Sequence, residues 1–193
     1  MKLFLTSLAG FILLASFSEW KTRYNEDGII VKIRSEGVNR DIYASVEVNA
    51  TVERCLEVLR DVNKLKRFSY RANIVGLVGQ PTADQWMVYT TYNMPALVKD
   101  RDVVVQYNIF RLNNGNIDVI YKSMSGVVPE SKDYKRQEDF TGAWQFEKIS
   151  PTRTRVIYTA FGTTDGFPGW LVNLVITAGP KYTMTNFRKE VEK

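Results

Sequence analysis

The chain has 193 residues, of which 45% are hydrophobic and 24% are charged, a balance typical of one globular domain with a real core. Its 26 Lys and Arg outnumber 21 Asp and Glu, but the basic residues are spread among acidic ones, so nucleic-acid binding is not indicated. There is no histidine and only one cysteine, Cys55, which excludes an intramolecular disulfide, a zinc cluster and the commonest general base. We expect no metal or other cofactor.

The first 18 residues differ from the rest. An apolar run over residues 3–17 follows Lys2, and it is too short and too often interrupted by small polar residues for a membrane span. Ser16 and Ser18 supply small side chains just before Glu19. This pattern predicts a signal peptide over residues 1–18, cleaved near Ser18, and therefore a secreted or periplasmic protein. The alternatives are an uncleaved anchor helix and a buried N-terminal helix.

The next segments predict a hairpin followed by a helix. Residues 20–27 are polar with two aromatic side chains, and we expect a short helix there. Residues 28–34 and 42–48 alternate in hydrophobicity, which is typical of paired strands. Thr51 can cap one helix that continues to Val62, with Cys55 packed on it as a small hydrophobic residue.

Strands dominate the middle of the chain. Alternation and turn residues predict strands over residues 74–78, 85–94, 102–112, 117–125, 134–149 and 154–163. The short loops between them favour antiparallel neighbours. We therefore predict a single α+β domain over residues 19–193 with one curved antiparallel sheet.

A long C-terminal helix over residues 166–193 completes the prediction, with Pro168 near its first position. One apolar face carries residues at three- and four-residue steps: Leu171, Leu174, Val175, Ala178 and Tyr182. Gly179 and Pro180 should bend the helix or start a second segment. This helix must bury its apolar face on the sheet, either closing onto it or leaving a cavity.

Period-two alternation assigns the inner face of the sheet. In residues 102–112 the more apolar face carries Val103, Val105, Tyr107 and Ile109, and in residues 134–149 one face carries Arg136, Glu138, Phe140, Gly142, Trp144 and Phe146. Arg136 and Glu138 are conspicuous because burying a charge is costly without a partner. They could reach water at the rim, form a polar spot inside a cavity, or act as a catalytic pair.

Tyrosines are frequent on the predicted strands, at Tyr89, Tyr92, Tyr107, Tyr121, Tyr134 and Tyr158. A tyrosine presents an apolar ring with a hydroxyl group, which suits a pocket for an amphipathic ligand. It is also a good strand former, so each one is equally consistent with a purely structural role.

Four stretches in the same order resemble the StAR-related lipid-transfer (START) family. They are VKDRDVVV at residues 98–105, KRQEDFTGAW at 135–144, the strand and turn over 158–166, and PGWLVN at 168–173. The likeness covers about residues 28–190.

The resemblance implies a helix-grip fold, in which a curved antiparallel sheet holds a C-terminal helix with a lipid-sized hydrophobic cavity between them. It also implies binding or transfer of sterols, phospholipids or other hydrophobic molecules without a cofactor. Several animal members carry an acid and an arginine inside the cavity, whereas here the arginine position is Tyr107 and residues 85–94 offer no acid. Cholesterol specificity is therefore not expected, and Arg101 and Asp102 are interpreted as an ion pair or turn that supports the fold rather than as a ligand site.

Three functions follow. The first is a non-enzymatic carrier or receptor for a lipid, sterol or similar ligand. Its predicted cavity residues are Tyr89, Tyr92, Val105, Tyr107, Tyr121, Arg136, Glu138, Phe140, Trp144, Tyr158, Leu171, Leu174, Val175, Ala178 and Tyr182, and its predicted gates are residues 127–133 and 162–169. The second is a polyketide cyclase- or hydrolase-like enzyme using Glu138, Arg136 or the tyrosines as acid or base. The third is a scaffold module with a closed core.

We expect a monomer that touches membranes transiently at most. Four cations on the late turns of the helix could meet anionic lipid head groups: Lys181, Arg188, Lys189 and Lys193. The same cations would also stabilise the helix C-terminus through its dipole.

Overall fold

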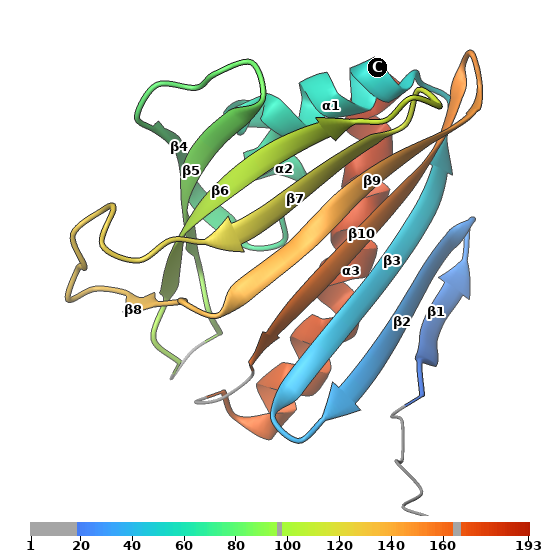
Figure 1. Cartoon of the computed structure of the whole chain (residues 1–193). Helices are drawn as coiled ribbons and strands as arrows, with labels where there is room; N and C mark the ends of the chain where they lie inside the picture. Colours follow the sequence, from blue (N-terminus) through green and yellow to red (C-terminus); the bar gives the residue numbers. More distant parts are fainter. Residues whose placement is uncertain (1–18, 96–97, 164–166) are drawn as a thin grey trace, which may run out of the picture.

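A large sheet curves around the C-terminal helix in a computed structural model of the chain (Figure 1). The structure describes residues 19–95, 98–163 and 167–193. The predicted signal peptide over residues 1–18 lies outside the described residues. In the part that is described, ten strands form one sheet with the order β1-β2-β3-β10-β9-β7-β6-β5-β4, and the short strand β8 pairs with β6 off this path. The predicted α+β fold with a curved antiparallel sheet is confirmed.

The N-terminal elements begin with three strands and two helices: β1 (Lys21–Glu26), β2 (Ile29–Glu36), β3 (Asn39–Val48), α1 (Val52–Arg60) and α2 (Val62–Phe68). The short helix expected over residues 20–27 is wrong, because this segment pairs with β2 as an edge strand. Its exposed charges, among them Lys21 and Arg23, are typical of an edge that must not pair further.

The predicted helix after Thr51 is divided in two. Thr51 does cap α1, since its hydroxyl accepts a hydrogen bond from the Arg54 amide at 3.1 Å. Asp61 then ends α1 and caps α2, because its carboxylate accepts from the amides of Asn63 at 2.9 Å and Lys64 at 3.2 Å. The second cap turns the chain before residue 62, which apolar periodicity alone does not reveal.

The remaining strands are β4 (Ala72–Val78), β5 (Gln85–Tyr92), β6 (Arg101–Arg111), β7 (Ile117–Ser123), β8 (Lys135–Arg136), β9 (Phe140–Ser150) and β10 (Arg153–Thr163). The single strand predicted over residues 134–149 is wrong at its start. Residues 135 and 136 instead pair in parallel with Arg101 and Asp102 at the beginning of β6, beyond the end of its pairing with β7. From Phe140 onward the predicted alternation holds, with Gly142, Trp144 and Phe146 buried.

Helix α3 (Gly169–Val191) crosses the inner side of the sheet as one continuous helix, with Pro168 at its N-cap. It does not restart at Pro180, which lies inside it. Met184 and Phe187 are fully buried in the main core with Val191, whereas Val172 and Ile176 form a small separate cluster with Ile33 of β2. The two halves of α3 are therefore packed against different parts of the core.

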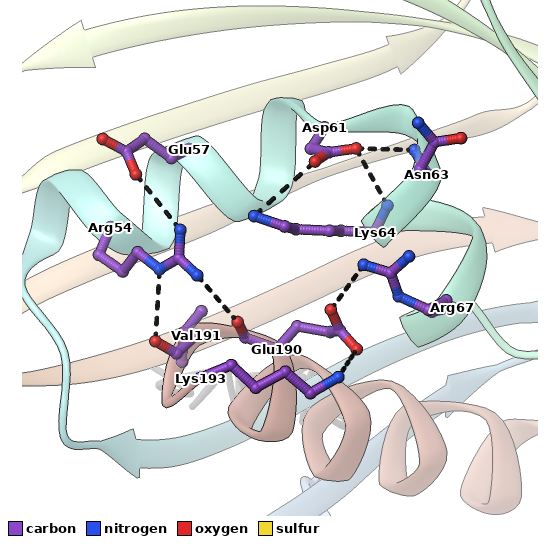
Figure 2. A network of polar contacts seen from close by, with 9 residues as sticks. All are labelled: Arg54, Glu57, Asp61, Asn63, Lys64, Arg67, Glu190, Val191 and Lys193. Atoms are coloured by element: carbon purple, nitrogen blue, oxygen red, sulfur yellow. Dashed lines mark hydrogen bonds and ion pairs between the residues drawn. The ribbon is translucent and has the colours of Figure 1, made fainter.

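A polar network holds the C-terminal end of α3 against α1 and α2 (Figure 2). The side chain of Glu190 is only 6% exposed and accepts hydrogen bonds from Arg67 at 2.8 Å and Lys193 at 2.6 Å. Arg54 on α1 donates to the carbonyls of Glu190 and Val191, each at 3.4 Å. This end of the helix is thus joined to both short helices.

Candidate ligand-binding cavity

A cavity of about 310 Å³ lies between the inner face of the sheet and α3, with α2 contributing part of its wall. Its interior is largely aromatic. Trp144 is the centre of the cluster, with ring centroids 4.9 Å from Tyr158, 5.0 Å from Phe187 and 5.8 Å from Phe68. The surroundings of Trp144 are therefore apolar and suited to shielding hydrocarbon from water.

Tyrosines line the same cavity from four strands. Tyr107, Tyr121 and Tyr158 are joined by ring contacts, with Tyr121 5.7 Å from Tyr107 and 6.3 Å from Tyr158. Burial raises the pKa of each of these three phenols, and also that of Tyr92, above its ordinary value. All four are therefore neutral at physiological pH and act as hydroxyl groups rather than as charged bases.

Tyr121 is fixed by close packing on β9. Its hydroxyl donates to the Thr159 carbonyl at 2.7 Å, and its ring lies directly over Gly142. A Cβ atom at Gly142 would come within 2.6 Å of the Tyr121 ring carbon Cζ. Glycine is thus needed at position 142 for a large side chain on β7 to reach across the neighbouring strand.

The α3 side of the cavity is formed by Val175, Ile176, Gly179, Pro180 and Thr183. Tyr182, predicted on this face, instead points outward and is 41% exposed, with its ring 5.5 Å from that of Tyr70. The prediction placed the inner face about one residue too early along the helix. It omitted Met184 and Phe187, which are both fully buried. With these two side chains packed inward, the buried face of the helix also includes Ile176 and Thr183.

Three arginines line the cavity at one end of the sheet. Arg101 begins β6 opposite Tyr92, Arg71 immediately precedes β4, and Arg40 lies near the start of β3, opposite Gly162 of β10. Arg101 is only 5% exposed, its guanidinium carbon lies 4.1 Å from the ring centroid of Phe167, and burial lowers its pKa from the ordinary value. An arginine remains protonated under physiological conditions despite such a shift.

The interpretation of Arg101 and Asp102 as an ion pair is wrong, because successive residues on a strand point to opposite faces. Asp102 faces the outer side, where Arg136 binds it through two hydrogen bonds of 2.9 Å and Tyr89 donates to it at 3.2 Å. Arg136 also donates to the Val128 carbonyl at 3.1 Å. This buried group fastens the 124–134 loop to the sheet.

The same geometry corrects three predicted cavity residues. Arg136 and Tyr89 belong to the outer group around Asp102, and Tyr89 could not share a face with Tyr92 because the two are three positions apart on β5. Glu138 lies between β8 and β9, exposed, with its carboxylate accepting from Ser125 at 3.1 Å. The strand break at residues 137–139 removed it from the aromatic face.

Some of the predicted cavity residues line the cavity and others do not. Seven lie around the cavity: Tyr92, Tyr107, Tyr121, Phe140, Trp144, Tyr158 and Val175. Val105 and Leu171 are buried outside the lining, Ala178 is half-buried outside it, and the side chain of Leu174 lies outside the described residues. Contact of any of these residues with a ligand stays a prediction.

Several lining residues were missed, among them Phe68, Ala160, Ile176, Phe167 and Arg101. A stricter period-two reading of β6 would have placed Arg101 with Val103 and Tyr107 on the inner face. Phe68 and Phe167 lie at or beside helix ends, where sequence periodicity does not define a face.

Cys55 is fully buried on α1, and burial raises the pKa of its thiol to about 12. It therefore packs as a small hydrophobic residue. Within residues 19–95, 98–163 and 167–193, no group of His, Cys, Asp and Glu side chains is placed to hold a metal ion. No helix in these ranges is long and apolar enough to cross a membrane.

No family model matches the chain. An uncharacterized protein of Pseudomonas aeruginosa is 27% identical over 178 residues, which cover 91% of this chain and 88% of the relative.

Among solved structures, a STAR-related lipid transfer protein from Xanthomonas axonopodis superposes with a TM-score of 0.80 at 22% identity, covering 90% of this chain and 99% of that one. Human StAR-related lipid transfer protein 5 gives 0.77 at 16% identity, over 89% and 86% of the two chains. The chain thus has the helix-grip fold of the StAR-related lipid-transfer domains, as its sequence motifs predicted.

The fold is also shared by an enzyme. The Zhui aromatase/cyclase from Streptomyces superposes with a TM-score of 0.58 at 13% identity, over 80% of this chain and 94% of the enzyme. The fold alone therefore does not separate binding from catalysis.

Proposed function

We propose that this protein is a non-enzymatic carrier or receptor that holds a hydrophobic ligand between its sheet and α3. The observation that supports this most directly is the cavity of about 310 Å³, which lies at the lower end of the range for small-molecule sites. Its aromatic interior would shield apolar ligand surface at roughly 25 cal/mol per Å². The likeness to lipid-transfer structures is consistent with this proposal.

A ligand needs a way into the cavity, and the N-terminal half of α3 is the element best suited to provide it. This half packs in the small cluster with Ile33, away from the main core. Pro180 has no amide hydrogen, so the helix lacks one hydrogen bond to the Ile176 carbonyl at the cavity wall. We propose that α3 bends at Pro180 and that its N-terminal half moves to admit the ligand, while the network around Glu190 keeps its C-terminal end in place.

Two segments, 162–169 and 127–133, were predicted from the sequence as gates. The 162–169 segment falls partly outside the described residues. The 127–133 loop is held to the sheet by Arg136, which donates to the carbonyls of Val128 and Pro129. That anchoring makes the loop a weaker candidate for a gate than α3.

Uptake of fluorescent lipid and sterol probes by the delipidated protein tests the carrier proposal. Ala160 is buried on the cavity face of β10, so Ala160→Phe should fill the cavity and abolish saturable uptake. Ala143→Phe is the matched control, because Ala143 lies on the opposite face of the neighbouring strand β9. No uptake of any probe by the unmodified protein, or equal uptake by both variants, would contradict the proposal.

Two of the acid–base candidates of the alternative, a cyclase-like enzyme, lie outside the cavity, whereas several of the tyrosines line it. Glu138 is exposed and Arg136 is engaged with Asp102 on the outer face, so neither lines the cavity. The cavity tyrosines are neutral, so they could donate a proton but would not act as charged bases. No observation favours this alternative over the carrier.

Export remains part of the proposal. The N-terminal pattern described above predicts a mature chain that starts near Glu19. Mass measurement of the protein purified from its own source would check this, and a mass that includes residues 1–18 would contradict it.

A further inference from the structure

The charged residues of the described cavity lining are unevenly distributed. Trp144, Tyr107 and Phe68 make the interior aromatic, whereas the arginines are gathered where β6 starts and β5 and β10 end. None of the described residues that line the cavity carries a carboxylate. Among the described lining residues, the charged side chains are therefore all cationic and lie at one end, and the other side chains are aromatic, aliphatic or neutral polar groups.

Two of the three arginines are fixed without neutralising their charge. Arg40 donates to the carbonyls of Gly37 and Asn39 at 2.6 and 2.7 Å, and Arg71 donates to the Asn93 carbonyl at 3.0 Å. A carbonyl has no net charge, so both guanidinium groups still contribute full positive charge to this end of the cavity. Such a field attracts anions and is strongest where low-dielectric walls surround it.

Arg101 is the deepest of the three. It is 5% exposed and stacks on Phe167. Gln137, whose backbone amide donates to the Asp102 carbonyl at 2.8 Å, lines the cavity as well. A planar guanidinium can bind a carboxylate or phosphate through two parallel hydrogen bonds, and an anion placed there would be shielded from water.

The size of the cavity limits the apolar part of the ligand. At about 310 Å³ it is at the lower bound for drug-sized ligands, so one hydrocarbon chain fits more readily than two. We infer that the ligand carries an anionic head group, a carboxylate or a phosphate, on a single hydrocarbon chain, and that this head group lies against Arg101. The inference rests on the proposed function and adds the ligand class to it.

Three ligands with the same chain test the inference: dodecanoic acid, dodecyl phosphate and dodecanol. Their affinities can be measured by displacement of Nile red, a neutral probe. The unmodified protein should bind at least one anionic ligand about tenfold or more tightly than dodecanol, since hydrogen bonds to charged groups are the strong ones. The better anion identifies whether the head group is a carboxylate or a phosphate.

Arg101→Met should weaken binding of the preferred anion by about 10- to 100-fold and change dodecanol affinity by less than about threefold. Arg111→Met is the matched control, because Arg111 lies on the same strand, is exposed and pairs with Asp84. If Arg101→Met does not fold, Arg101→Lys keeps the charge but loses the two-bond geometry, and it should reduce the preference for anions partially.

The failures are distinguishable. Absence of binding by Nile red and by all three ligands would overturn the proposed function and this inference together. Binding of Nile red and dodecanol with no preference for either anion would overturn the inference alone. Equal loss of anion and dodecanol affinity in Arg101→Met would do the same.

Discussion

Asp102 and Arg136 form an ion pair whose side chains are 2% and 5% exposed. Hydrogen bonding to Asp102 raises the pKa of the Arg136 guanidinium. A buried pair costs much desolvation to form, but removing one partner leaves an uncompensated buried charge. The group therefore matters less as net stabilisation than as a fixed point that joins β8 and the 124–134 loop to β6.

Arg136→Met should lower the free energy of unfolding by about 3–5 kcal/mol, because Asp102 would be left buried without its cation. Urea unfolding at neutral pH measures this. Arg111→Met removes an exposed pair and should change stability by less than about 1 kcal/mol. Similar losses of stability in the two variants would contradict a structural role for the buried Asp102–Arg136 pair.

Glu190 should make stability depend on pH. Hydrogen bonds from Arg67 and Lys193 lower the pKa of its carboxyl to about 2. Because the folded-state pKa is depressed, the stabilisation is present above the unfolded-state value near 4.3 and is lost as the pH falls toward 2.

Glu190→Gln should therefore cost about 1–2 kcal/mol at pH 7, the lower part of this range reflecting the half-exposed Arg67. The difference from the unmodified protein should shrink as the pH drops from 5 to 3, as urea titrations would show. Glu57→Gln is the control, since Glu57 is 67% exposed, and a pH-independent loss in Glu190→Gln would contradict the assignment.

At the scale of elements, β9 illustrates how one strand serves the cavity. Gly142 gives Tyr121 room to cross from β7, and Trp144 presents its ring to α2 and α3. The sequence predicted this alternation from Phe140 onward. It did not predict the break before Phe140, because the break depends on Arg136 finding Asp102, a partner 34 residues away.

Gly142→Ala should destabilise the protein by about 1–3 kcal/mol, because the new methyl group would overlap the Tyr121 ring and the Thr159 carbonyl. It should also alter probe uptake, since the displaced ring is part of the cavity wall. Thermal unfolding and probe titration measure the two effects.

Gly76→Ala on β4 is the matched control, because nothing lies within 4 Å of its added methyl group and its backbone is not left-handed. It should be neutral or stabilising by up to about 1 kcal/mol. Equal stability of the two variants would contradict the close packing at Gly142.

For the whole molecule, the cavity links ligand binding to stability. A ligand that binds only the folded state adds about 2.7 kcal/mol at a concentration one hundred times its dissociation constant. We expect melting temperature to rise with ligand concentration in the unmodified protein and in Ala143→Phe, but not in Ala160→Phe. A rise in all three would place the ligand outside the cavity between the sheet and α3.

The sequence by itself determined most of the architecture, because period-two strands, short loops and a final amphipathic helix are local patterns. It also identified seven of the residues around the cavity, those on regularly alternating strands and Val175 on the helix. It failed where local order ended: the edge strand β1, the cap at Asp61 and the start of β9.

Only the tertiary structure decided which side chains meet. The rotation of α3, which turns Ile176 inward and Tyr182 outward, follows from packing Met184 and Phe187 against the main core. The roles of Arg101 and Asp102 likewise depend on long-range partners on opposite faces of one strand. Periodicity defines faces along a segment, but the free energy of burying a charge or a ring depends on residues that are distant in sequence.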